Sequence, residues 1–460
     1  MAIAPNSPAA RDIAYALHPY TNLEQHQKEG SLIVKGGKGV YIYDDTGREY
    51  LEGLAGLWST SLGWGEDRLV DAATKAMRQL PYYHQFGAKA HEPGIDLAER
   101  LIKMAPVPFS KAFFTNSGSE ANDTAIKIIW YYNAVLGRSQ KKKIISRLRA
   151  YHGVTLATAS LTGLPHLHKY FGLPIGEVKH TSCPHYYRNA HPGETEEDFA
   201  TRMAADLEKL ILEEGPDTIA AMFAEPIMGA GGVLLPPRTY FEKIQAVLKK
   251  YDILFVADEV ICGFYRTGNV WGSETYGLKP DILTCAKALS SSYLPVAGVL
   301  ISEPIFQALA KGSAEVGNWG HGYTYSGHPV ACAVALETLN IYEERDILGH
   351  VRKMAPVLQN GIRRFADHPM VGEVRGTGLI GAVELVKDKA TKTSFDPKQF
   401  VGAYLAKRAQ AHGLITRAMG DHLGFCPPLI ITAEQIEELL RRFKLALDDT
   451  HEWVQEQGWM

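Results

Sequence analysis

The chain has 460 residues, of which 46% are apolar and 22% are charged, and its formal net charge is −3. This composition is that of an ordinary globular protein, with room for one large α/β domain and a smaller one. The nearly balanced charge gives no electrostatic reason to expect nucleic acid or an anionic membrane as a partner. We therefore expect the partners to be small molecules or a second copy of the chain.

No targeting or membrane segment is recognisable in the sequence. The first twenty residues lack a basic segment followed by an apolar core, and no apolar stretch approaches the length needed to cross a bilayer. The five cysteines are scattered and form no CxxC pair, which suits a reducing compartment and disfavours a structural zinc site. We expect a cytoplasmic protein without a metal site.

Residues 1–60 predict the N-terminal part of a small domain, because short alternating stretches lie between Pro and Gly turns and Asp45-Thr46-Gly47 is typical of a hairpin. Residues 61–325 predict a large α/β domain, because amphipathic helices alternate there with short apolar runs. The runs expected to form strands are KAFFT, KKKIISRL, TIAAMFAE, ILFVADEV, DILTCAK and PVAGVLIS.

Residues 326–460 predict a C-terminal small α+β domain. It begins with the helical stretch GHPVACAVALETLNIYEE and continues with the strand-like stretch VGEVRGTGLIGAVELV. Further helices are expected around residues 399–412 and 433–455.

Polar side chains follow the predicted strands of the large domain at the point where each strand ends. Open α/β sheets bind their ligands at the carboxyl ends of the strands, so these side chains are expected to share one crevice. Any one of them alone could simply cap a helix. They are Asn116-Ser117-Gly118-Ser119 after KAFFT, Tyr151-His152 after KKKIISRL, Glu225 after TIAAMFA, Asp258 after ILFVA and Lys287 after DILTCA.

The segment NSGSEAND predicts a phosphate cradle at the start of a helix. Free N–H groups at the helix N-terminus bind an anion, Gly118 lets the backbone approach it, and Ser117 or Ser119 donates a hydroxyl. The alternative is a capping box between Ser117 and Glu120 with no ligand.

Asp258 and Lys287 together predict a cofactor with an aromatic nitrogen that is joined to a lysine through an imine. Asp258 would keep the protonated ring nitrogen charged, and Lys287, with a lowered pKa, would attack an aldehyde and then shuttle protons. Tyr151 would stack on the flat ring. The alternatives are a buried cap or ion-pair partner for Asp258, a solvated surface residue for Lys287 and a packed corner for Tyr151.

These residues occur in the order found in class III pyridoxal-phosphate aminotransferases, and the chain resembles the ω-amino acid or amine:pyruvate transaminases within that family. The motifs that carry the resemblance are GLWSTSLGWG, FFTNSGSEAND, AYHG, AEPIMGAGG, ADEVICGF, AKALSSSYLP, GHGYTYSGHP and ITRAMGDHLGFCPPL. The resemblance implies the pyridoxal-phosphate-dependent transferase fold type I. That fold has a large, mostly parallel seven-stranded α/β sheet domain and a smaller α+β domain built from both termini.

The resemblance also implies roles for individual residues around pyridoxal 5′-phosphate. Lys287 forms the internal aldimine, Asp258 pairs with the pyridine nitrogen, and Tyr151 stacks on the ring with Val260 on its other face. Glu225 positions the aspartate side of the site, with His152 beside Tyr151. The phosphate cup is formed by Ser117, Gly118, Ser119 and, from the neighbouring subunit, Thr324. A shared site implies a homodimer or a dimer of dimers with active sites at the interface.

A substrate pocket follows from the same resemblance, with apolar walls from Trp58, Phe86, Tyr151 and Ala230. Arg417 is its carboxylate clamp, because a planar guanidinium binds both carboxylate oxygens, although from sequence alone it could be a surface residue. We expect Arg417 to swing toward a keto acid and away from an apolar donor, in a loop made mobile by Gly420 and Gly424.

Two residues depart from the family pattern. Tyr265, in CGFYRTG, stands where the family usually has glycine, which puts the local turn and any contact of Arg266 in question. Tyr82, in LPYYHQF, replaces a common phenylalanine and makes the entrance slightly more polar.

The predicted function is ping-pong transamination from an ω-amino acid or primary amine to pyruvate, giving an aldehyde or ketone and alanine. A decarboxylase or an aminomutase could use the same Asp258 and Lys287. A nicotinamide-dependent oxidoreductase is disfavoured because GAGG at 229–232 leads into the prolines of LLPPRTY instead of a helix. A binding protein without catalysis is a further alternative.

Overall fold

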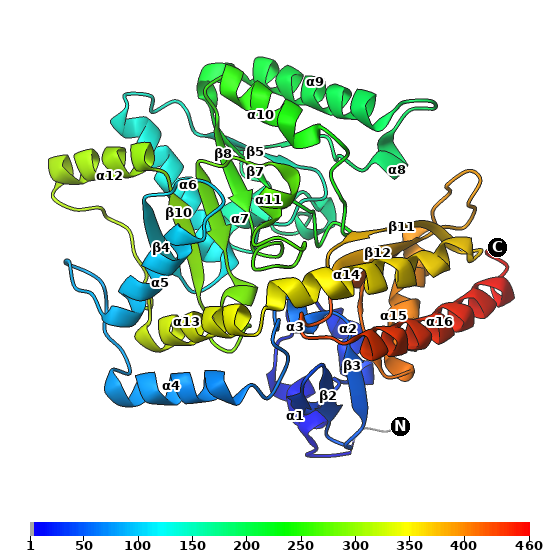
Figure 1. Ribbon diagram of the computed structural model, residues 1–460. Helices are drawn as coiled ribbons and strands as arrows, with labels where there is room; N and C mark the ends of the chain where they lie inside the picture. Colours follow the sequence, from blue (N-terminus) through cyan, green and yellow to red (C-terminus); the bar gives the residue numbers. More distant parts are fainter. Residues whose placement is uncertain (1–3) are drawn as a thin grey trace.

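The computed structural model describes residues 4–460 and contains three β-sheets (Figure 1). The largest has seven strands, and the other two have four strands each. None of the helices in residues 4–460 combines the length and the apolar character that spanning a bilayer requires.

The seven-stranded sheet is mostly parallel, because only β10 runs against its two neighbours. This confirms the predicted fold class. The central strands β7 and β8 are almost entirely buried, as expected for parallel strands covered on both faces. In spatial order the strands are β4 (Lys111–Thr115), β10 (Ala297–Ile301), β9 (Ile282–Cys285), β8 (Leu254–Asp258), β7 (Ile219–Ala224), β5 (Lys143–Arg147) and β6 (Val178–Thr181).

Helices cover both faces of this sheet because successive strand residues point to opposite sides. Val256 packs with the helices α6 (Gly118–Val135), α7 (Leu156–Leu161) and α12 (Glu303–Val316). Its neighbours Phe255 and Ala257 pack with α9 (Glu196–Glu214) and α10 (Tyr240–Lys250) on the other side. At the β9–β10 side, a third cluster joins α5 (Glu92–Lys103) and α13 (Pro329–Glu344) to the C-terminal elements.

The two small sheets bring the ends of the chain together. One contains β1 (Val34–Lys38), β2 (Tyr41–Asp44), β3 (Glu49–Glu52) and β13 (Leu414–Ile415), and the other contains β11 (Val371–Thr377), β12 (Ile380–Leu385), β15 (His422–Phe425) and β14 (Arg417–Met419). The hairpin predicted at Asp45-Thr46-Gly47 joins β2 to β3, with Gly47 at φ +83°. Because β13 pairs with β3, both termini build the smaller part of the fold, while the domain boundaries at residues 60 and 325 stay a prediction.

The remaining helices complete the fold. The helices expected around 399–412 and 433–455 are α15 (Val401–Ala411) and α16 (Ala433–Glu456). The other α-helices are α1 (Pro8–Tyr15), α2 (Leu23–Glu29), α3 (Ala55–Trp58), α4 (Asp67–Gln79), α8 (Tyr186–Asn189), α11 (Gly272–Tyr276) and α14 (Ile347–Arg363). Short 3₁₀ turns lie at Pro165–Leu167, Pro216–Thr218, Lys287–Ser290, Arg364–Asp367 and Pro397–Gln399.

Candidate active site

A cavity of about 900 Å³ lies at the carboxyl ends of the parallel strands. It is lined by every residue predicted for the site except Phe86 and Thr324. Strands β4, β5, β7, β8 and β9 all point the same way, so the residues that follow them meet at one edge of the sheet. The predicted lining residues are Trp58, Ser117, Gly118, Ser119, Tyr151, His152, Glu225, Ala230, Asp258, Val260, Lys287 and Arg417.

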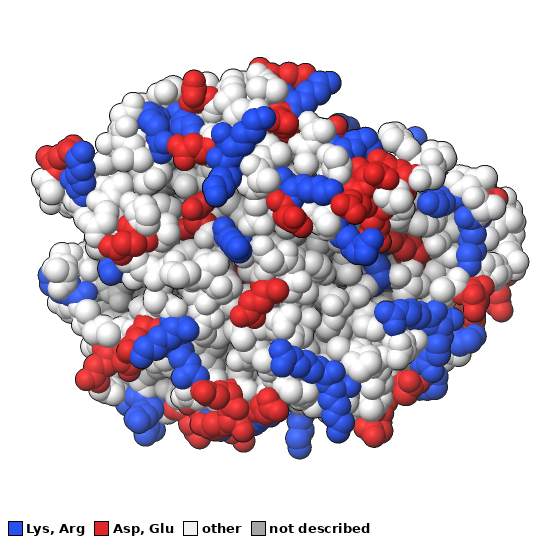
Figure 2. All heavy atoms as spheres, turned by 45° about the horizontal axis from the view of Figure 1, so that its top comes forward, with Lys and Arg blue, Asp and Glu red and all other residues white. Residues whose placement is uncertain are grey.

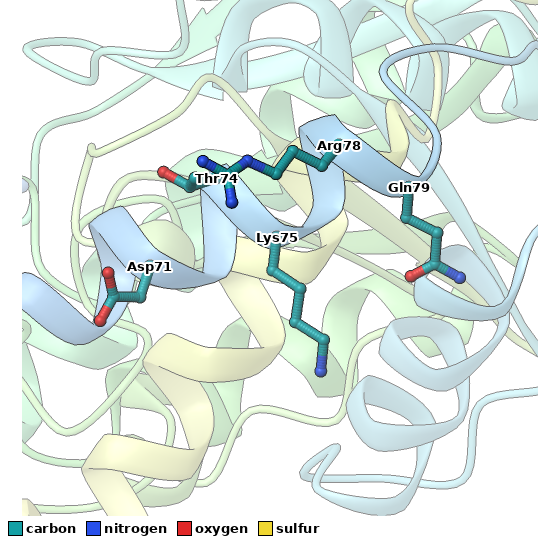
Figure 3. Close-up of a pocket in the computed structure, with 5 residues that line it drawn as sticks. All are labelled: Asp71, Thr74, Lys75, Arg78 and Gln79. Atoms are coloured by element: carbon teal, nitrogen blue, oxygen red, sulfur yellow. The ribbon is translucent and has the colours of Figure 1, made fainter.

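A second hollow, of about 460 Å³, lies on the outer surface of α4, away from the sheet edge (Figure 3). Its lining comes from this one helix, and Lys75 and Arg78 extend in different directions. No predicted site residue lines it. On the face shown in Figure 2, acidic and basic side chains are interspersed over the surface.

Asp258 lies at the bottom of the large cavity as the last residue of β8 and is only 4% exposed. Its Oδ2 atom accepts a hydrogen bond from Asn122 Nδ2 at 2.7 Å and lies 2.8 Å from His152 Nδ1. Its Oδ1 atom accepts from the backbone N–H of Val260 at 3.1 Å. A buried carboxylate is stable only when its oxygens are paired in this way, and the pairing fixes its orientation.

Asn122 is held in turn by two further groups. Its Nδ2 also donates to the backbone carbonyl of His152 at 2.8 Å, and its Oδ1 accepts from Thr284 Oγ1 at 2.8 Å. Thr284 lies on β9 directly opposite Asp258 on β8. The amide therefore connects helix α6, two strands and the loop that carries Tyr151.

Glu225 ties together two loops that border the cavity. Its carboxylate accepts from the backbone N–H of Tyr151 at 3.0 Å and from that of Gly229 at 3.0 Å. Burial raises the pKa of this carboxyl group, with nearby Asp258 adding to the increase. These hydrogen bonds go to the Tyr151 and Gly229 backbone, so Glu225 positions the ring-stacking loop and the loop of Ala230.

The start of α6 has the features of an anion-binding helix N-terminus. Ser117 caps the helix by accepting from the backbone N–H of Glu120 at 3.2 Å, and Ser119 Oγ accepts from the backbone N–H of Val154 at 3.1 Å. Each hydroxyl keeps its O–H free to donate. Within residues 4–460, the backbone N–H groups of Gly118 and Ser119 donate to no protein acceptor. Ser117 therefore caps the helix as the alternative predicted, and the N–H groups needed to bind a phosphate remain available.

Gly118 also makes room that a larger residue would fill. A Cβ atom placed there would lie 2.9 Å from Val260 Cγ2, closer than non-bonded carbon atoms normally approach. Val260 and the first turn of α6 are thus in contact across the cavity wall.

Lys287 follows β9 at the start of a 3₁₀ turn and adopts φ +50°. Within the described part of the chain, its Nζ atom forms no hydrogen bond or ion pair. Burial lowers the pKa of this amine from 10.5 to about 8, although the charge of Asp258 acts in the opposite direction. A lysine that is neutral in part near physiological pH is suited to nucleophilic attack and proton transfer.

Tyr151 lies in the loop after β5 and lines the same cavity as Asp258, and burial raises the pKa of its hydroxyl well above the ordinary value. Tyr20, from the N-terminal segment, donates its hydroxyl to Tyr151 Oη at 3.3 Å. Pro19 and Tyr20 both line the cavity. The sequence did not indicate that this segment belongs to the site, because His18-Pro19-Tyr20 contains no motif that is typical of a ligand-binding residue.

The other end of the cavity is formed by Trp58, Ala230 and Arg417. Trp58 is 3% exposed, adopts φ +63° and packs in an apolar cluster with Ile227 and Ile261. Arg417 is the first residue of β14, and its guanidinium makes no ion pair among residues 4–460. This end of the cavity thus has apolar walls and one guanidinium available for an anionic ligand.

Phe86 and Thr324 lie outside this cavity but close to each other. Phe86 is 49% exposed, and its ring approaches Gly322, two residues before Thr324. The backbone carbonyl of Thr324 accepts from Tyr82 Oη at 2.8 Å. Their predicted roles need a second subunit and stay predictions.

Tyr265 adopts φ +77°, the left-handed conformation that glycine tolerates best. Its ring packs edge-on against Tyr342, with 5.5 Å between the centroids. Arg266 is nevertheless buried, and its guanidinium donates to the backbone carbonyls of Leu379 and Pro427. The turn therefore keeps a backbone suited to glycine, and aromatic packing accompanies the strained conformation.

Sequence analysis also missed Asn122 and Thr284. Both are polar residues inside otherwise apolar elements, one turn into α6 and within the strand ILTC. A buried amide or hydroxyl on such a face needs a partner, and that requirement was the available signal.

The segment GAGG has no feature of a dinucleotide-binding turn. A bridge between Met228 and Leu234 closes it into a loop, and the next helix, α10, begins only at Tyr240. A nicotinamide fingerprint requires a helix N-terminus directly after the glycines.

Comparison with known proteins agrees with this geometry. The model of the family "Aminotransferase class-III" matches residues 23–447. The chain belongs to the class III aminotransferases. It is a transaminase of the pyridoxal-phosphate fold type I, and it uses pyridoxal 5′-phosphate to move an amino group from an amine to a keto acid.

Three relatives illustrate the likeness. Gamma aminobutyrate transaminase 1, mitochondrial, of Solanum lycopersicum is 52% identical over 441 residues, covering 96% of this chain and 86% of the relative. The omega transaminase from Pseudomonas jessenii in complex with PMP is 55% identical with a TM-score of 0.96, covering 98% and 99% of the two chains. A thermostable omega transaminase variant, W58M/F86L/R417L, engineered for asymmetric synthesis of enantiopure bulky amines, is 55% identical with a TM-score of 0.96, covering 97% and 100%.

The cavity of this transaminase fits the coenzyme. It offers unpaired N–H donors at Gly118 and Ser119 for a phosphate, a buried carboxylate at Asp258 for a ring nitrogen and an unpaired amine at Lys287 for an aldehyde.

Proposed function

We propose that this transaminase transfers the amino group of an ω-amino acid or a primary amine to pyruvate, giving an aldehyde or ketone and alanine. The Solanum relative is named for γ-aminobutyrate, an ω-amino acid, and the engineered structural relative is described as a catalyst for bulky amines. Both classes of compound carry an amine that is not flanked by a carboxylate.

The observation that carries this proposal is the unpaired guanidinium of Arg417 at the end of the cavity whose apolar walls are formed by Trp58 and Ala230. The positive charge of Arg417 contributes to the lowered pKa of Lys287, so the two cations act on the same space. A keto acid such as pyruvate needs a cation for its carboxylate, and an apolar amine needs the wall formed by Trp58 and Ala230.

The engineered relative supports the assignment of the substrate end. Its three substitutions replace a tryptophan, a phenylalanine and an arginine, and this chain has the same residue types at the same numbers. We therefore assign Trp58, Phe86 and Arg417 to the substrate pocket.

When bound, pyridoxal phosphate supplies an aldehyde that condenses with an amine and a cationic ring that accepts electrons from the substrate carbon. We assign Ser117, Gly118 and Ser119 to the phosphate, using the N–H groups and hydroxyls at the start of α6. Asp258 keeps the ring nitrogen protonated by a charge-assisted hydrogen bond. Tyr151 and Val260 would hold the ring between them. His152 contacts Asp258, and Glu225 accepts from the backbone of the Tyr151 loop, so they keep these groups in place.

Lys287 is the residue that moves the proton. Its Nζ atom would take up the proton released from the substrate carbon and later return it, which requires a neutral amine at the start of the step. The lowered pKa supplies that neutral form.

Arg417 serves the two half-reactions differently. It binds the carboxylate of pyruvate, and it turns away when an apolar amine occupies the same space. Gly420, at φ +65°, lies in an open turn directly after β14 and gives this segment conformational freedom.

A second subunit would complete the site. Tyr82 and Tyr325 form an exposed aromatic pair beside Thr324, and the exposed ring of Phe86 approaches Gly322 nearby. Exposed aromatic side chains of this kind are typical of an interface. We propose that a homodimer, alone or as a dimer of dimers, covers these side chains and brings Phe86 and Thr324 to the cavity of the partner. The cytoplasmic location stays a prediction, since the Solanum relative is named as mitochondrial.

A donor panel with pyruvate tests the substrate assignment. β-Alanine, γ-aminobutyrate, putrescine and an aryl-alkyl amine are each incubated with the holoenzyme, and alanine formation is followed. We expect alanine with at least one of these donors and a chromophore fixed on Lys287 by borohydride. Absence of alanine with every donor, while the chromophore is present, would overturn the proposed substrates but not the family.

A further inference from the structure

Three potential metal ligands converge in the N-terminal segment, outside the active-site residues. Asp12 lies on α1, His26 lies on α2, and His18 lies on the turn between these helices. Both histidines direct Nε2 at the same carboxylate, with His18 at 2.9 Å from Oδ1 and His26 at 3.0 Å from Oδ2. We propose that Asp12, His18 and His26 form a binding site for a divalent transition-metal ion such as Zn²⁺, and that the ion fixes the segment that closes over the active site.

The geometry is close to that of a metal site. The ligand atoms all lie within 4.8 Å of one another, and the two imidazole centroids are 4.4 Å apart. In a tetrahedral zinc site with bonds of about 2.0–2.1 Å, neighbouring ligand atoms are about 3.3 Å apart. Side-chain rotations that open the present contacts by a few tenths of an ångström would therefore admit the ion.

The chemistry of the ligands suits zinc and its neighbours. Two imidazoles and one carboxylate, with a position left for water, are a common donor set for such ions. Ser31 Oγ donates to Asp12 Oδ2 at 2.6 Å, which orients the carboxylate as an outer-shell partner does.

A second cluster with similar ligands shows why the charge balance matters. His185, Glu373 and Glu384 also lie close together, but Arg375 contacts both glutamates, and Arg188 contacts Glu384. The charges of those carboxylates are already balanced by arginine side chains. Among residues 4–460, no lysine or arginine pairs with Asp12, so its negative charge is available to a metal ion.

The ion would act on the active site through Tyr20. This residue lies between the ligands His18 and His26, and its hydroxyl contacts that of Tyr151. Pro19 and Tyr20 line the catalytic cavity. A metal ion bound at both ends of this short segment would hold Tyr20 over the cavity, because it removes conformational freedom from the segment.

The site is accessible to an ion from solvent. The side chains of His18 and Asp12 are 30% and 20% exposed, whereas that of His26 is 7% exposed. One ligand is therefore buried in the fold, and the other two face an entry path.

Equilibrium dialysis of the holoenzyme against Zn²⁺, followed by elemental analysis, tests the site. We expect one additional ion per chain in the natural protein and its loss in the double variant His18→Gln/His26→Gln. The matched control is His412→Gln, which removes a histidine that also faces a carboxylate, Asp449, but shares it with Arg408. Equal zinc uptake by the double variant, or no uptake by the natural protein, would overturn the proposal and would identify the cluster as a hydrogen-bonded latch.

Two further measurements test ligation and its effect. Co²⁺ in place of zinc should give ligand-field absorption at wavelengths beyond the coenzyme band, and the double variant should lack it. Trypsin cleavage after Arg11 and Lys28, which are exposed on either side of the segment, should slow severalfold with Zn²⁺ in the natural protein only. Unchanged cleavage of the zinc-loaded natural protein would refute the fixing of the segment.

Discussion

The two ends of the catalytic cavity are built in different ways. At the coenzyme end, Asp258, Asn122 and His152 are almost fully buried and connected by hydrogen bonds of 2.7 to 2.8 Å. At the substrate end, Arg417 has no ionic partner within residues 4–460, and Trp58 and Ala230 offer only apolar surface. The first end is supplied by the edge of one sheet, and the second is assembled from distant parts of the chain.

This difference separates chemistry from specificity. A buried polar network holds charges in one arrangement and tolerates little change, since any lost partner leaves another group unsatisfied. An apolar wall with one unpaired cation can accept substrates of several shapes. We therefore expect substitutions at the coenzyme end to reduce all reactions together, and those at the substrate end to change one substrate relative to another.

The largest expected effect comes from Lys287→Ala. Loss of the proton-moving amine should lower kcat by roughly 10⁴-fold for every donor and acceptor. Single-turnover kinetics with the coenzyme added in excess measures it, and Lys279→Ala, an exposed lysine before the same strand, should retain full activity. A Lys287→Ala enzyme that keeps more than a tenth of the rate would contradict the role of this residue.

Asp258→Asn should lower kcat on the order of 10²- to 10³-fold, because an amide keeps the shape but does not hold a cation at the ring nitrogen. The absorbance of the bound coenzyme should change in the same variant. Asp252→Asn serves as the control, since Asp252 precedes the same strand and its side chain is 74% exposed. Equal activity of the two variants would refute a catalytic role for Asp258.

Arg417→Ala should distinguish the substrate end of the cavity from the coenzyme end most clearly, because it should slow the reaction with one acceptor and not with another. The kcat/KM for pyruvate should fall roughly 10- to 100-fold, which is the loss expected when hydrogen bonds to a charged group are removed. The kcat/KM for a neutral aldehyde acceptor should change by less than about threefold, because it has no carboxylate for Arg417 to bind. Arg441→Ala, an exposed arginine on α16, provides the control. Equal losses with both acceptors would show that Arg417 does not select the carboxylate.

The smallest effect is a pH dependence of coenzyme uptake. The neutral amine of Lys287 attacks the aldehyde, so uptake by the coenzyme-free enzyme should rise about tenfold per pH unit below the pKa of about 8 and level off above it. Free Nα-acetyl-lysine, with an amine pKa near 10.4, should continue to rise to higher pH. Parallel profiles for the enzyme and the free amine would show that burial does not lower the pKa of Lys287.

Much of the coenzyme end could be predicted from sequence, and little of the substrate end. Strand ends are recognisable because apolar runs stop at a polar residue, and parallel strands bring those residues to one edge. Asp258 and Lys287 were found in this way. Trp58 and Arg417 have no such local signal. The position of Trp58 depends on a positive φ, and that of Arg417 depends on the preceding strand β13, which pairs with the distant β3, so only the family resemblance indicated them.

The elements that were missed have physical reasons as well. Strand β6 has the sequence VKHT and lies at an edge of the sheet, where its two polar middle residues are only half-buried and the apolar pattern is weak. Asn122 and Thr284 are polar groups within apolar elements, and their partners are visible only in three dimensions. Tyr265 was identified as a departure, yet its left-handed backbone could not be known from the residue type.

The short pairing of β13 with β3 has a consequence for how the enzyme matures during synthesis. Every group assigned to the coenzyme lies at or before Thr324, and β10, which joins β4 to the rest of the sheet, ends at Ile301, so this part of the chain is made well before Arg417. Arg417 belongs to the last tenth of the polypeptide, and the strand just before it, β13, pairs with β3, which is made some 360 residues earlier. A nascent chain can thus acquire the means to bind its coenzyme before it can choose a substrate.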